Sequence, residues 1–81
     1  MEFRDRRVLV TGGTRGIGRA AVESFLAAGA TVAVNGRTAE SVAAALKELA
    51  AGERVIAAPG DTATAAGCKA VVDAAVAGLG G

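Results

Sequence analysis

The fold of this chain is decided by residues 11–18, which read TGGTRGIG and directly follow the apolar run VLV at residues 8–10. A short apolar run without polar alternation predicts a strand that is buried on both faces. The glycines Gly12, Gly16 and Gly18 predict a tight turn, a close approach of the backbone to a ligand, and close packing of the next helix on the sheet. A helix N-terminus has free N–H groups and the positive end of the helix dipole, so we expect this turn to bind phosphate.

Two other interpretations of the turn are less consistent with the residues around it. A phosphate-loop NTPase would carry Lys-Ser or Lys-Thr after its last glycine, whereas Gly18 is followed by Arg19 and Ala20. A glycine-rich turn that binds nothing is the alternative without a function. Because strand, turn, helix and second strand follow in register, nucleotide binding is favoured over it.

The rest of the chain alternates apolar runs with helical patterns. Further strands are predicted at residues 31–35 and 54–58, each followed by glycine or proline. Helices are predicted over residues 16–28, from an N-cap at Thr38 to an end at Gly52, and over residues 64–77. This order predicts an α/β fold of βαβαβα form, with a parallel sheet of strand order 3-2-1. We expect the first two helices on one face and the third on the other.

The helical periodicity also predicts which side chains are buried. Ile17 is expected on the buried face of the first helix, and Cys68 and Val72 on that of the third. The charged pairs that are expected to face outward, each spaced i,i+4, are Arg19 with Glu23 and Lys69 with Asp73.

The residues after the second strand indicate the type of nucleotide. NAD-binding sheets carry Asp or Glu near this place to bond the ribose 2′-hydroxyl, but residues 35–38 read NGRT. Arg37 has the planar donors that pair with a 2′-phosphate, and Arg15 of the turn is expected to reach the same group. If both arginines are instead solvated surface residues, the preference is lost. We predict NADP(H) as the cofactor.

The segment after the third strand adds a contact to the base. Asp61 and Thr62 follow that strand, and ligands lie beyond the carboxyl ends of parallel strands. Asp61 is therefore expected to accept from the adenine amino group, or to cap the third helix together with Thr62 or Thr64. The residues predicted to bind the cofactor are Gly12, Thr14, Arg15, Gly16, Ile17, Gly18, Asn35, Arg37, Thr38, Asp61 and Thr62.

Composition excludes several other classes of protein. The 81 residues contain no His and no Tyr, which excludes a His-assisted nucleophile and a phenolic acid and leaves little basis for a zinc site. The net charge of +1 gives no footprint for nucleic acid, and no apolar run is long enough for a membrane span. The single cysteine, Cys68, forms no internal disulfide. A cytoplasmic location is the expectation.

These motifs resemble the short-chain dehydrogenases/reductases over residues 7–81. The family's Thr-Gly-x-x-x-Gly-x-Gly corresponds to residues 11–18, and Asn-Gly-Arg after the second strand is familiar from its NADP-dependent members. Asp61 matches the family's adenine-contacting aspartate. The resemblance implies a Rossmann-type dinucleotide-binding segment and, in the complete enzyme, hydride transfer between NADPH and a carbonyl or alcohol.

The chain departs from the family pattern in its catalytic groups. The family's Asn-Asn-Ala-Gly segment, its catalytic serine and its Tyr-x-x-x-Lys are missing, so we expect no catalytic residue and no turnover by this chain alone. Residues 1–81 are expected to be one segment cut before the fourth strand. Its first strand would then need the missing half or another chain beside it. The alternative is a stand-alone nucleotide-binding or scaffold module that a partner chain completes.

Overall fold

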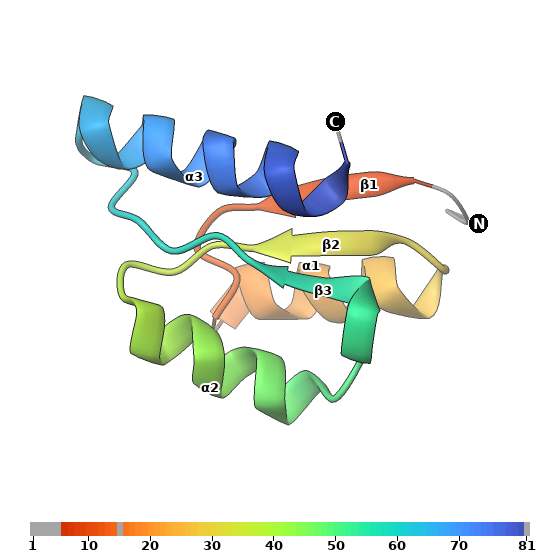
Figure 1. Ribbon diagram of the computed structural model, residues 1–81. Coiled ribbons are helices and arrows are strands. Elements are labelled where there is room, and N and C mark those ends of the chain that lie inside the picture. Colours follow the sequence, from red (N-terminus) through yellow and green to blue (C-terminus); the bar gives the residue numbers. More distant parts are fainter. Residues whose placement is uncertain (1–5, 15, 81) are drawn as a thin grey trace.

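A computed structural model describes residues 6–14 and 16–80 of the chain. Strands and helices alternate in the predicted order (Figure 1). The elements are β1 (Arg7–Val10), α1 (Gly16–Ala27), β2 (Thr31–Val34), α2 (Ala39–Leu49), the short 3-10 turn η1 (Gly52–Arg54), β3 (Val55–Ala57) and α3 (Ala65–Leu79). Arg15, which was predicted to bind phosphate, lies outside the described residues.

The three strands form one parallel sheet with β2 in the centre. Val8 of β1 is opposite Val32 of β2, and Val32 is opposite Val55 of β3. The spatial order β1-β2-β3 is the predicted order 3-2-1 counted from the other edge. Because β2 has a neighbour on each side and helices on both faces, residues 32–34 are fully buried, whereas β1 is only partly buried.

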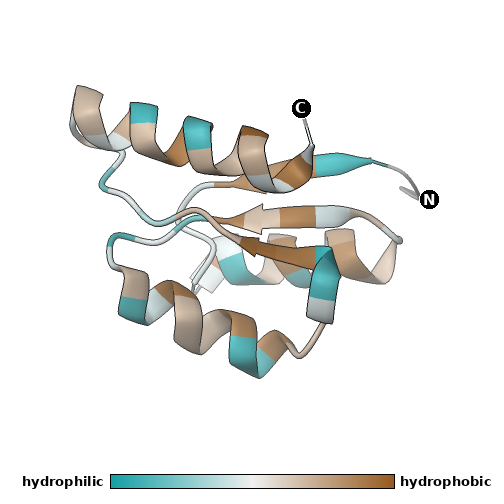
Figure 2. Cartoon of the chain, viewed as in Figure 1, coloured by the Kyte–Doolittle hydropathy of each residue, from teal (hydrophilic) through white to brown (hydrophobic). Residues whose placement is uncertain are grey.

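Helices cover both faces of the sheet, as predicted: α1 and α2 lie on one face and α3 on the other (Figure 1). The strands between them are coloured mainly as hydrophobic, whereas hydrophilic positions occur on the helices, in the loops and at the start of β1 (Figure 2). Val22 of α1 packs with Val32 and Val34 on one face. Val71 and Ala75 of α3 pack with Ala33 on the other.

The helix ends follow local rules, with one correction. Thr38 and Thr64 cap α2 and α3, since their hydroxyls accept from Ser41 N at 3.1 Å and Gly67 N at 2.9 Å. The prediction that Gly52 ends α2 was wrong. Ala50 adopts the left-handed conformation at φ 50° and donates its N–H to Leu46 O, so the helix closes two residues earlier.

Three buried positions were also predicted wrongly. Cys68 is exposed, and Val72 and Ile17 are 51% and 92% exposed. The line of contact between α3 and the sheet runs through Val71 and Ala75. A rotation of about 100° per residue turns Val72 away from this line. Ile17 lies in the first turn of α1, before the part of that helix that enters the core.

Candidate nucleotide-binding site

The glycine-rich turn joins β1 to α1 with the geometry its sequence requires. Gly12 and Gly16 have φ of +63° and +65°, a region that residues with a Cβ rarely adopt. A Cβ at Gly18 would lie 2.1 Å from the carbonyl oxygen of Gly12, so only glycine allows α1 to pack there. The close approach at Gly18 is therefore to the turn itself, and not to the sheet as predicted.

Asn35, directly after β2, holds three loops together. Its side chain is buried, with Oδ1 accepting from Gly12 N at 3.1 Å. Its Nδ2 donates to Ala58 O at 2.9 Å and to Gly60 O at 3.1 Å. The side chain thus bonds the glycine turn to the segment that follows β3. In this structure Asn35 positions the loops, while a direct contact with nucleotide stays a prediction.

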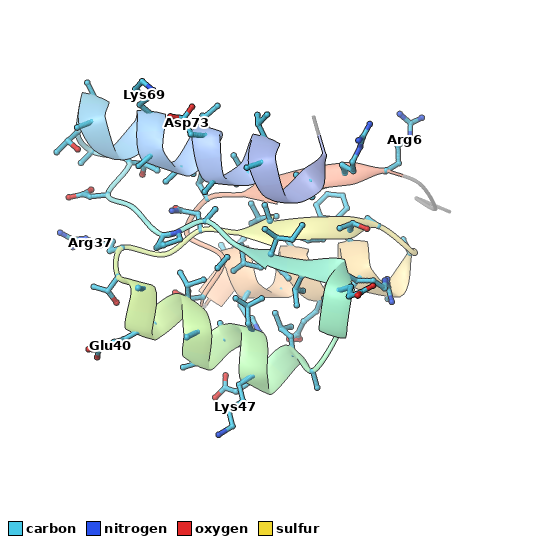
Figure 3. All side chains as sticks on the ribbon, in the orientation of Figure 1. Arg6, Arg37, Glu40, Lys47, Lys69 and Asp73 are labelled. Atoms are coloured by element: carbon cyan, nitrogen blue, oxygen red, sulfur yellow. The ribbon has the colours of Figure 1, made fainter. Side chains whose placement is uncertain are left out.

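The two segments after β2 and β3 run side by side. Gly60 donates its N–H to Gly36 O at 2.9 Å. This bond places the next residue of each segment, Arg37 and Asp61, at the same end of the sheet, beyond the last residues of β2 and β3. Arg37 Nη2 lies 3.8 Å from Asp61 Oδ2. Arg37 projects from this end of the molecule with 84% of its side chain exposed (Figure 3). The sequence had predicted both residues as separate nucleotide contacts, but not their pairing.

These segments and α2 line a cleft of about 740 Å³. Seven of the predicted residues line it, namely Gly12, Thr14, Asn35, Arg37, Thr38, Asp61 and Thr62. Gly16, Ile17 and Gly18 do not line this cleft and lie at the start of α1. The lining residues that were not predicted are Gly36, Ser41, Ala44, Ala45, Glu48 and Gly60.

The α2 residues that were missed share one face of that helix. Ser41, Ala45 and Glu48 are spaced by four and three residues, and this spacing places them together. The spacing that reveals this face was therefore present in the sequence, although Ala45 is itself buried. Ser41 also closes the first turn of α2, because its Oγ donates to Thr38 O at 3.0 Å.

Arg19 connects α1 to the α2 wall of the cleft. It had been predicted to face outward beside Glu23, and its Nε does lie 3.8 Å from Glu23 Oε1. Its side chain is nevertheless only 21% exposed, and Nη1 donates to Glu48 Oε1 at 3.0 Å. The Glu48 carboxylate in the cleft therefore already has a cationic partner.

Two further properties concern the described part of the chain. Residues 6–14 and 16–80 contain no group of three or more His, Cys, Asp or Glu side chains that could hold a metal ion. In the same residues, no helix has the length and hydropathy needed to cross a membrane.

The comparison that decides the family is a match of residues 6–81 to the model of the short chain dehydrogenase family. The chain belongs to this family. The match includes the glycine-rich turn, all three strands and all three helices described above. The resemblance carried by residues 11–18 and by Asn-Gly-Arg is thereby confirmed at the level of the family.

Several known proteins are similar to this chain. It is 49% identical over 49 residues to the uncharacterized oxidoreductase YvrD of Bacillus subtilis, which covers 60% of this chain and 19% of that protein. The Pseudomonas aeruginosa RhlG/NADP active-site complex superposes with a TM-score of 0.82 at 37% identity, over 90% of this chain and 28% of that one. A Burkholderia phymatum short chain dehydrogenase/reductase in complex with NAD superposes with a TM-score of 0.85 at 30% identity, over 99% of this chain and 29% of that one.

The chain thus spans about a fifth of the length of the curated relative and less than a third of these two solved structures. The similarity establishes the family and the Rossmann-type α/β fold. One of these structures holds NADP and the other holds NAD.

Proposed function

We propose that the cleft binds the adenosine half of NADP(H), and that residues 1–81 act as one dinucleotide-binding segment of an oxidoreductase. In the complete enzyme, hydride would pass between NADPH and a carbonyl or alcohol. The observation that carries the NADP preference is the end of β2. Where NAD-binding sheets carry an acidic side chain, residues 35–38 read NGRT and contain no carboxylate. The buried amide of Asn35, the first of these residues, is bonded to Gly12, Ala58 and Gly60.

The residues around this position fit a 2′-phosphate. Arg37 presents an exposed guanidinium beside the cleft, and a guanidinium pairs with phosphate through two parallel hydrogen bonds. Thr38 and Thr14 add hydroxyl groups to the same wall. The free N–H groups at the start of α1 are proposed to face the diphosphate, with Gly16, Ile17 and Gly18 beside it. Arg15 is proposed as the second cation on its sequence position alone.

We further propose that this chain by itself does not turn over substrate. It contains no tyrosine, and the resemblance assigns the proton transfer of the family to a Tyr-x-x-x-Lys pair. A cytoplasmic location and completion of the β1 edge by more of the protein or by another chain remain parts of the same proposal. A scaffold that keeps the fold without binding nucleotide is the alternative.

The test is a calorimetric titration of the 81-residue chain with NADPH and with NADH, with circular dichroism on the same sample. We expect folded protein that binds NADPH at least about tenfold more tightly than NADH, since one charge-assisted bidentate contact contributes about 1.5–3 kcal/mol. Arg37→Gln should remove most of this difference.

Lys47→Gln is the matched control, because it removes the same charge from the last turn of α2 at a residue that does not line the cleft (Figure 3). It should leave the preference unchanged. A folded chain that binds the two nucleotides equally contradicts the NADP assignment, and a folded chain that binds neither supports the scaffold.

A further inference from the structure

The guanidinium of Arg37, which is the group expected to bind the 2′-phosphate, forms an ion pair with Asp61. The bond from Gly60 N to Gly36 O sets the two residues at adjacent positions, and their charged atoms are 3.8 Å apart. With side chains 84% and 42% exposed, the pair is solvated. Pairs of this kind are weak and exchange partners readily.

The two members of the pair are not held equally. Asp61 Oδ1 accepts from Ala63 N at 2.9 Å, and its main-chain oxygen accepts from Thr64 N at 3.2 Å. A Cβ at Gly67 would lie 1.8 Å from that same oxygen, so the start of α3 packs directly on Asp61. In the described part of the chain, Arg37 makes no ion pair except the one with Asp61. The carboxylate is therefore anchored, whereas the guanidinium is free to move.

We infer that Asp61 sets how strongly the site prefers 2′-phosphorylated nucleotides, by competing with the phosphate for Arg37. This inference rests on the proposed function. A 2′-phosphate that binds Arg37 competes with the carboxylate for the guanidinium and then carries its charge close to Asp61. A nucleotide with a free 2′-hydroxyl needs no such exchange. Asp61 is thus a positioning residue that lowers the discrimination between the two ligands.

The other carboxylate of the cleft does not have this effect. Glu48 lines the same cleft, but its Oε1 is 3.0 Å from Arg19 Nη1, on a side chain that is only 21% exposed. The negative charge of Glu48 is therefore balanced by Arg19. Asp61 is therefore the carboxylate on which the preference should depend.

The experiment compares 2′,5′-ADP with 5′-AMP as ligands for the full chain and for Asp61→Asn. The asparagine keeps an oxygen that accepts from Ala63 N and removes only the charge. We expect the ratio of the two affinities to shift toward 2′,5′-ADP by roughly three- to tenfold, and the shift to shrink as salt is added. Use of the ratio removes any contact of Asp61 with adenine, which both ligands share.

Two further variants separate charge from structure. Asp61→Ser also retains an acceptor for the turn and should reproduce the shift. In an Arg37→Gln background, Asp61→Asn should shift the ratio by less than in the parent, because the competition for Arg37 no longer exists. If the unmodified chain prefers 2′,5′-ADP but Asp61→Asn leaves the ratio unchanged, the inference fails while the proposed function stands. If the unmodified chain shows no preference, both fail.

Discussion

The two faces of the sheet are packed with different kinds of side chain. On the face of α1 and α2, the buried cluster contains four valines and one alanine, and large partly buried residues surround it, among them Phe25, Leu26, Leu46 and Leu49. On the face of α3, the buried cluster contains three alanines, Ala33, Ala58 and Ala75, and one valine, Val71. Burial of a valine or leucine contributes about 1.5–3 kcal/mol. The difference indicates that the α1–α2 face supplies most of the hydrophobic stabilisation.

The position of α3 depends more on close backbone approach and polar contacts than on the burial of large side chains. Gly67 lets the helix pack against Asp61, and Arg7 of β1 donates to the last carbonyl of α3, Leu79 O, at 3.1 Å. At the same time Val72 and Val76 of α3 remain about half exposed. The candidate site lies at the end of the sheet where the glycine turn that leads into α1 is bonded, through Asn35, to the segment that leads into α3.

The largest effect is expected at Asn35, which bonds those segments together. Asn35→Leu keeps the branching and the number of side-chain heavy atoms but leaves Gly12 N–H, Ala58 O and Gly60 O without their partner. The bond to Ala58 O is buried and the other two are partly buried. An unpaired buried polar group costs about 1–3 kcal/mol, so we expect a loss of about 3 kcal/mol in the free energy of unfolding by urea. Nucleotide affinity should fall as well, because the glycine turn loses its support.

The control for Asn35 is Thr38→Val, at another residue of the same cleft wall. Thr38 is exposed, and its loss removes one cap, which should cost about 1 kcal/mol. If Asn35→Leu costs no more stability than this control, the buried amide is not what holds the glycine turn to the segment after β3.

The second prediction compares the faces directly. Val34→Ala removes two methyl groups from the α1–α2 cluster and should cost about 2–3 kcal/mol, since large neighbours cannot close the cavity. Val71→Ala makes the same change on the α3 face, where the buried neighbours are alanines, and should cost about 1–2 kcal/mol. Urea unfolding of both variants measures the difference. An equal or reversed order would show that α3 is packed as firmly as α1 and α2.

The third prediction uses the ends of the helices. Both α2 and α3 end on a left-handed residue, but in α3 it is Gly80 at φ 84°, and in α2 it is Ala50 at φ 50°. Because glycine adopts this conformation without steric cost, Ala50→Gly should stabilise the chain by up to about 1 kcal/mol. The adjacent Ala51, at φ −96°, is the control, and Ala51→Gly should destabilise by about 0.5 kcal/mol. A loss of stability in Ala50→Gly would contradict the assignment of the strain.

Much of this arrangement could be predicted from the sequence, since apolar runs and glycine spacing determine the strands, their order and the turn. The caps Thr38 and Thr64 were predictable because their hydroxyls act within one turn. The tertiary partners were not. Asn35 was expected to touch ligand because its type and position suit that role. Only the fold brings Gly12, Ala58 and Gly60 close enough to engage its amide. The end of α2 at Ala50 was missed because its sequence offers a glycine two residues later.

The smallest effects concern two ion pairs, one on each face. Arg19 and Glu48 join α1 to α2, and among the described residues the Nε of Arg19 has no hydrogen-bond partner. Because Glu48 is largely exposed, Glu48→Gln should cost about 0.5 kcal/mol. Lys69 and Asp73, 2.7 Å apart, lie on the outer side of α3 (Figure 3). The hydrogen bond and charge of Asp73 raise the pKa of Lys69 above its usual value of 10.5. A raised pKa contributes stability that is present below pH 10.5 and is lost as the pH rises through the folded value.

Since both groups are exposed, Asp73→Asn should barely change urea unfolding at pH 7, and even that difference should vanish above the raised pKa of Lys69. An effect of Asp73→Asn larger than that of Glu48→Gln, or one that grows at high pH, would mean that the outer surface of α3 stabilises the chain more than the contact between α1 and α2 does.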